Sequence, residues 1–66
     1  MNINKLKGKI VENGLTIDEL AKSIGTTRSS LYRKLNNSEK ITIGEAVKIK
    51  GVLSLTNEEA SEIFLG

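Results

Sequence analysis

The sequence predicts an all-α fold, a compact bundle of four or five helices. Three threonines are each followed three residues later by a glutamate, a spacing that lets both side chains satisfy the free amides of a helix's first turn. Apolar residues then recur at three- and four-residue spacing, which is typical of one helix face. Proline is absent, and no long stretch alternates apolar with polar residues, which disfavours a sheet. The pairs are Thr16 with Glu19, Thr42 with Glu45, and Thr56 with Glu59.

The chain has 66 residues, so we expect residues 1–66 to form a single domain with a small core. Hydrophobic residues make up 38% of the chain and aromatic residues only 3%, so Ile, Leu, Val and Ala must build that core. Such a domain is marginally stable unless its helices are well capped or a partner adds buried area.

Several function classes are excluded by composition. The chain has no cysteine and no histidine, which excludes a thiol nucleophile, a disulfide framework and the usual Cys/His zinc site. Its carboxylates fall in helix caps or scattered positions, so we expect neither an enzyme nor a cofactor. No apolar run approaches the roughly 20 residues that span a bilayer. We therefore expect a cytoplasmic protein with no membrane partner.

Charge is distributed unevenly. Residues 1–50 hold all ten lysines and arginines and carry a net charge of +5, whereas residues 51–66 carry −3 from Glu58, Glu59 and Glu62. A polyanion would be attracted to the first part and repelled by the second. Ordinary surface solubilisation explains the same pattern equally well.

The first helix is expected over residues 3–13. Ile3, Leu6 and Ile10 share one stripe, with Val11 beside it. Gly14 ends the helix.

Residues 16–36 read as two short helices joined at a glycine. Ile17, Leu20, Ala21 and Ile24 form the inward face of the first, and Gly25 supplies the conformation in which the chain leaves it. Thr26 and Thr27 can cap the second helix, whose inward residues are Leu31 and Leu35. Its outward residues are Arg28, Ser29, Tyr32, Arg33 and Asn36.

Two further helices follow a polar loop at residues 36–40. The helix that begins after Thr42 has an expected inward stripe, and Gly51 either interrupts or ends it. The helix after Thr56 is short and has its own inward face. The first stripe contains Ile43, Ala46, Val47 and Ile49 and continues to Val52 or Leu53, and the second contains Ala60, Ile63 and Phe64.

The stretch from 16 to 36 resembles the helix-turn-helix of the phage repressor and Cro family. The resemblance implies a lambda-repressor-like DNA-binding domain. It also implies a small phage or prophage regulator that binds operator DNA in the switch between lytic growth and lysogeny, inside a bacterial host cell. Its expected partners are double-stranded DNA and a second copy, as a homodimer on DNA. The matching residues are Leu20, Ala21, Ile24, Gly25, Thr27, Leu31 and Leu35.

The resemblance also assigns residues to the DNA. In this family the N-terminal half of the second motif helix faces base edges in the major groove. Arg28 could make a bidentate bond to guanine. The alternative is that these side chains are the solvated face of an amphipathic helix. The positions matching base or adjacent phosphate contacts are Thr27, Arg28, Ser29, Tyr32 and Arg33.

Phosphate contacts are expected where the first motif helix begins and in the loop after the second. Three residues depart from the pattern: relatives often carry a polar residue in place of Ile17, and Asp18 and Glu19 oppose phosphate. For Asn36 and Asn37, turn formation explains the residues equally well. The positions are Thr16, Ile17, Asn36, Asn37, Ser38 and Lys40.

The C-terminal segment is a candidate partner interface, formed by Leu55, Ile63, Phe64 and Leu65. The alternative is that these residues complete the core, which we favour for Phe64. The interface motivates a rival function, that of an antirepressor or modulator that acts by contact with a partner repressor protein.

Overall fold

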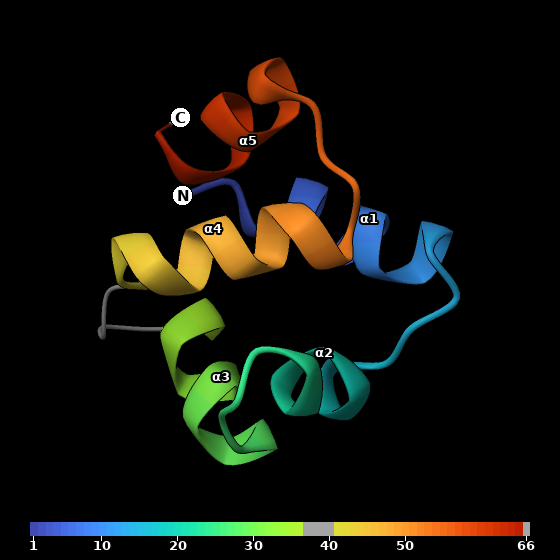
Figure 1. Ribbon diagram of the computed structural model, residues 1–66, viewed down its shortest axis with the longest axis vertical. Helices are drawn as coiled ribbons and strands as arrows, with labels where there is room; N and C mark the ends of the chain where they lie inside the picture. Colours follow the sequence, from blue (N-terminus) through green and yellow to red (C-terminus); the bar gives the residue numbers. More distant parts are fainter. Residues whose placement is uncertain (37–40, 66) are drawn as a thin grey trace.

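The computed structural model describes residues 1–36 and 41–65, which form five helices and, within those ranges, no strand. Helix α4 crosses the middle of the molecule, with α1 and α5 on one side and α2 and α3 on the other (Figure 1). The all-α fold is therefore confirmed. The helices are α1 (Ile3–Glu12), α2 (Ile17–Ser23), α3 (Arg28–Asn36), α4 (Ile43–Val52) and α5 (Asn57–Phe64).

The helix starts agree with the sequence prediction. All three threonine–glutamate pairs form reciprocal capping boxes, at the beginnings of α2, α4 and α5. In each box the threonine hydroxyl accepts from the glutamate amide at 3.1 Å. The sequence reasoning missed one further cap, the Asn2 side chain, which accepts from the Lys5 amide at 3.1 Å and starts α1.

Helices α1 and α2 end as predicted, at glycines in the left-handed region. The φ angles of Gly14 and Gly25 are +71° and +80°. Helix α4 ends differently, because it runs through Gly51 to Val52, and Ser54 takes the left-handed position at φ +51°. Gly51 therefore neither interrupts nor ends the helix.

Every helix contributes to one core. Two expected stripes need correction, because Val11 is 75% exposed and Ile43 and Val47 are 85% and 63% exposed. On α4 the core is contacted by Ile49, which lies about 200° around the helix from Val47 at 3.6 residues per turn, so Val47 faces away. The buried residues are Leu6, Ile10, Leu20, Ala21, Ile24, Leu31, Leu35, Ile49, Leu53, Leu55 and Ile63.

Helix α5 packs beside α1, and hydrogen bonds and ion pairs join the first residues of the chain to its last helix. The Asn2 amide donates to the Ile63 carbonyl at 2.7 Å, and both ends lie together in Figure 1. Ion pairs also join Lys5 to Glu62 and Lys9 to Glu59. Two of the three C-terminal acids are thus paired with lysines of the same chain.

Candidate nucleic-acid interface

The turn between α2 and α3 fixes the geometry of the candidate interface. The Gly25 amide donates to the Lys22 carbonyl at 3.2 Å and the Thr26 amide to the Ala21 carbonyl at 2.9 Å. These bonds satisfy the last carbonyls of α2, and the positive φ of Gly25 redirects the chain. Ala21 is fully buried where the two helices meet, and its small side chain permits a close approach.

Helix α3 is capped and anchored from behind. The Thr27 hydroxyl accepts from the Ser30 amide at 3.1 Å, which satisfies an amide of the first turn. Leu31 and Leu35, each 1% exposed, hold the opposite face in the core. Because these two leucines fix the rotation of α3 about its axis, the face with Arg28, Ser29, Tyr32 and Arg33 is presented to solvent.

The five residues predicted for base reading lie together on the exposed side of α3 and at its start. Arg28 and Ser29 occupy the first turn, and Tyr32 and Arg33 lie one turn later. Tyr32 is 47% exposed. Within residues 1–36 and 41–65, neither Arg28 nor Arg33 has an ion-pair partner. A guanidinium in this setting can donate two parallel hydrogen bonds to a guanine edge or a phosphate.

Three of the six residues predicted to contact phosphate lie in the described part of the chain, and each of these has another structural role. Thr16 is exposed, but its hydroxyl and its amide both serve the capping box of α2. The Ile17 side chain packs against the core. At the end of α3, the Asn36 side-chain amide donates to the Tyr32 carbonyl at 2.9 Å. The other three predicted positions, Asn37, Ser38 and Lys40, lie outside the described residues.

The predicted partner interface is wrong for two of its four residues. Leu55 is 6% exposed and Ile63 is 0% exposed, so both belong to the core. The short α5 buries Ile63 because α1 packs against it. Phe64 is half-buried and packs against the core, as favoured. Leu65 alone of the four is largely exposed, at 83%.

Lys34 is a positioning residue that the sequence reasoning missed. Its ammonium binds the Glu45 carboxylate at 2.6 Å and so joins α3 to the first turn of α4. This bond and, next, the one from the Thr42 amide hold the pKa of Glu45 below its ordinary value of 4.5. No sequence spacing indicates a pair between two helices, and the capping role of Glu45 had already explained that residue.

Comparison with known families identifies the motif. A family model described as the helix-turn-helix domain of resolvase matches residues 4–38. The match covers more than half of the chain and takes in α1, α2 and α3. The chain belongs to this helix-turn-helix family. Helices α4 and α5 of the helix-turn-helix protein lie beyond the matched residues. Neither the curated proteins nor the solved structures gave a match.

Family membership shows a DNA-binding type of domain and assigns roles to the two motif helices. In a helix-turn-helix the second helix enters the major groove, and in this protein that helix is α3. Membership does not assign the contacts of individual residues. In the described part of this helix-turn-helix protein, no helix is both long and apolar enough to cross a membrane.

Proposed function

We propose that this helix-turn-helix protein is a small Cro-like transcriptional regulator from a phage or prophage. In this proposal it binds operator DNA and acts in the choice between lytic growth and lysogeny. The resolvase-type match supports DNA binding, and the Cro-like role rests on the resemblance of residues 16–36 together with the helices α4 and α5 that follow the motif.

The observation that carries the DNA-binding proposal is the exposed face of α3. Arg28 and Ser29 lie in its first turn, next to the turn that a docking helix-turn-helix places at the groove. Arg28 would form a bidentate pair with guanine, and Tyr32 and Arg33 would contact bases or the backbone one turn later. Thr27, at the start of α3, would contact a base or an adjacent phosphate. Thr16, Ile17 and Asn36 would lie nearer the phosphates.

Two acids that would oppose DNA are partly compensated, which favours DNA binding over the rival antirepressor function. Asp18 pairs with Lys22 at 3.4 Å on the surface of α2. The Glu19 carboxylate accepts a hydrogen bond from the Thr16 amide in the capping box. Both charges are therefore engaged in starting and stabilising α2, and neither needs an external basic partner to explain it.

The test compares DNA preference between wild type and Arg28→Ala. A preferred duplex is first selected from random DNA with the wild-type protein, and binding to it and to a scrambled duplex is then measured by fluorescence anisotropy. Loss of a bidentate guanine contact removes about 1–3 kcal/mol of discrimination. We expect the ratio of the two affinities to fall about 5- to 150-fold.

The matched control is Lys7→Ala, which removes one exposed cation from α1, across α4 from α3 (Figure 1). It should lower both affinities slightly and leave their ratio unchanged, because a distant charge acts only through the general field. Equal ratios for wild type and Arg28→Ala would refute the docking of α3. A wild-type protein with no selectable site would refute operator binding.

A further inference from the structure

Asn13 and Gly14, where α1 ends, form a pair of residues that can react with each other. In an Asn-Gly pair the backbone nitrogen of the glycine can attack the side-chain carbonyl carbon of the asparagine, because no side chain shields that nitrogen. Asn13 is exposed and caps the C-terminus of α1, and Gly14 follows it in the left-handed conformation. No other asparagine of the chain precedes a glycine.

The Asn13 side chain joins the end of α1 to the end of α4. Its amide nitrogen donates to the Lys9 carbonyl at 2.8 Å, within α1. It also donates to the Leu53 carbonyl at 3.3 Å, and Leu53 is the residue that caps the C-terminus of α4. One amide group therefore holds the C-terminal ends of two helices together.

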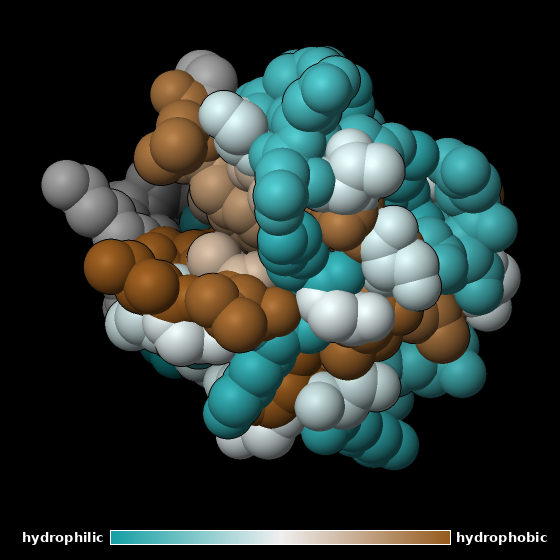
Figure 2. Space-filling model, turned by 45° about the horizontal axis from the view of Figure 1, so that its top comes forward, coloured by the Kyte–Doolittle hydropathy of each residue, from teal (hydrophilic) through white to brown (hydrophobic). Residues whose placement is uncertain are grey.

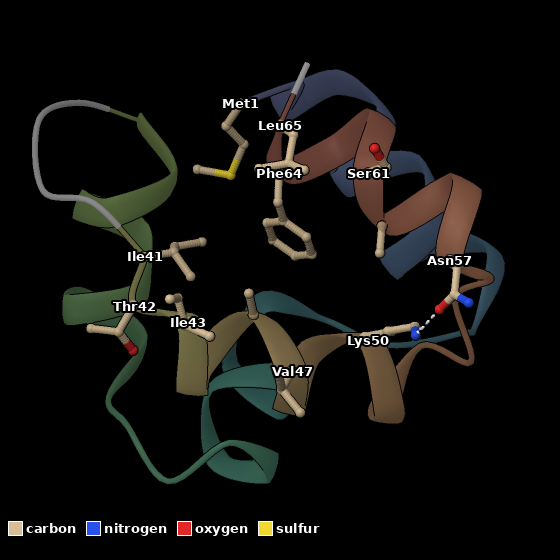
Figure 3. A pocket seen from close by; sticks show the side chains of 12 residues that line it. Met1, Ile41, Thr42, Ile43, Val47, Lys50, Asn57, Ser61, Phe64 and Leu65 are labelled. Carbon is tan, nitrogen blue, oxygen red and sulfur yellow. Dashed lines mark hydrogen bonds between the residues drawn. The ribbon is translucent and has the colours of Figure 1, made fainter.

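This bond matters because few polar contacts attach α4 to α1 and α5. Helix α5 packs chiefly on α1 and α4 chiefly on α2. Between α4 and α5 lies a hollow of about 650 Å³, around which hydrophobic residues gather in Figure 2. Lys50 and Asn57 form a hydrogen bond at one end of this hollow (Figure 3). Among the described residues, that bond and the one from Asn13 to Leu53 are the two side-chain hydrogen bonds that join α4 and its cap to α1 or α5 and their caps.

The folded turn occupies both reacting groups. The Gly14 amide must lose its proton before it can attack, and it donates that proton to the Val11 carbonyl at 2.9 Å. The Asn13 side chain, whose carbonyl carbon is attacked, is held by its two hydrogen bonds. These bonds must break before the nitrogen and the carbon can meet, so the reaction requires a local opening at the end of α1.

We propose that Asn13 is a modification site, at which the chain deamidates when the end of α1 opens and which the folded turn protects. The Gly14 nitrogen gives its proton to hydroxide and forms a bond to the Asn13 side-chain carbon. The bond from that carbon to the side-chain nitrogen breaks, and the nitrogen leaves as ammonia with a proton from water. The cyclic imide then takes up one water and opens to aspartate or isoaspartate. The net reaction consumes one water and releases one ammonia.

The product cannot restore the bond between the two helix ends. An ionised carboxylate has no hydrogen to donate, so it would face the carbonyls of Lys9 and Leu53 with a partial charge of the same sign. It also places a negative charge at the C-termini of α1 and α4, where the helix dipole disfavours it. A modified chain is therefore less stable than an unmodified one, whether or not the protein binds DNA.

The first experiment follows the reaction in the full chain. The protein is incubated in mildly alkaline buffer with and without urea, and peptide mapping by mass spectrometry measures acid formation at each asparagine. A short model peptide that contains Asn-Gly, kept in the same two buffers, corrects for the direct effect of urea. We expect Asn13 to react first in the unfolded chain, and about tenfold or more slowly in the folded chain. Earlier conversion of another asparagine, or equal corrected rates, overturns the proposal.

The second experiment compares Asn13→Asp, which mimics one product, with Asn36→Asp. The Asn36 side chain donates to the Tyr32 carbonyl at 2.9 Å in the last turn of α3, and within residues 1–36 and 41–65 it makes no hydrogen bond to another helix. Both changes put a carboxylate at a helix end, but only Asn13→Asp removes a bond between helices. In urea unfolding, the ratio of folded to unfolded chain should be about 3- to 10-fold lower for Asn13→Asp than for Asn36→Asp. Equal ratios would overturn the predicted effect of the modification.

Discussion

Ser54 occupies a backbone conformation that favours glycine. At φ +51° it closes the end of α4, where the Leu55 amide donates to the Lys50 carbonyl at 3.0 Å. The equivalent positions after α1 and α2 hold Gly14 and Gly25. An L-residue in the left-handed region costs roughly 1–2 kcal/mol, so the third helix end of this type is strained where the first two are not.

Ser54→Gly should therefore stabilise the protein. We expect a gain of about 0.5–1 kcal/mol, because glycine relieves the left-handed strain but loses more backbone entropy on folding. Urea unfolding followed by circular dichroism measures the change. Ser61→Gly is the control: Ser61 lies inside α5, where glycine should destabilise. A loss of stability in both variants would contradict the assignment of strain to Ser54.

At the scale of elements, a partly buried ion pair joins α3 to α4. The side chains of Lys34 and Glu45 are 16% and 18% exposed. Glu45 has two tasks, because it also caps α4 through the Thr42 amide at 3.0 Å. Among the described residues, the Glu19 side chain has only the capping task in α2. These two glutamates allow the contribution of the pair to be separated from that of the cap.

We expect Glu45→Gln to cost more stability than Glu19→Gln. Glutamine can still complete a capping box, so both variants keep their caps, but only Glu45→Gln leaves the Lys34 ammonium without its carboxylate. The additional loss should be about 1 kcal/mol, as for a charge-assisted hydrogen bond that is partly solvated. Denaturant titrations of the two variants, side by side, measure it. Equal losses would show that the pair adds nothing.

Features that depend on residues close together in the sequence could be predicted from it. The caps at Thr16, Thr42 and Thr56 were predicted because each depends on two residues three apart. The exposed face of α3 followed from Leu31 and Leu35 in the same way. The DNA contacts of that face stay predictions.

Long-range packing was the part that sequence could not supply. Ile43 and Val47 have helical spacing relative to Ala46, but which stripe of α4 meets the core depends on where α2 lies. Leu55 and Ile63 are buried for the corresponding reason, since α1 covers α5. Ser54 gave no signal, because serine is not a residue that marks a helix end.

For the whole molecule, the ion pairs between α1 and α5 make stability depend on pH. The hydrogen bond from the Lys9 ammonium, and next the one from the Thr56 amide, lower the pKa of Glu59 to about 2 from 4.5. The same hydrogen bond raises the pKa of Lys9 above 10.5. A lowered carboxyl pKa adds stability that is present above pH 4.5 and is lost as pH falls toward 2. The raised lysine pKa adds stability that is lost as pH rises beyond 10.5.

We therefore expect the melting temperature to decline as pH falls from 6 to 2, with the pair contributing part of that decline. Glu59→Gln should make the decline shallower, because it removes the titrating group and keeps a capping side chain. Glu58→Gln is the control, since Glu58 has no ion-pair partner within residues 1–36 and 41–65. Thermal melts of both variants and the wild type at a series of pH values measure these declines. Identical slopes in Glu59→Gln and Glu58→Gln would exclude the contribution of the pair.

The hydrogen bond from Asn2 to the Ile63 carbonyl has a practical consequence for anyone handling this protein. Because it brings the amino end beside the last turn of α5, an affinity tag or fluorophore attached at either end would emerge next to Met1 and Leu65. Such an attachment would crowd the hollow that Met1 and Leu65 line. A dye placed through a cysteine introduced at Val11 would avoid the obstruction.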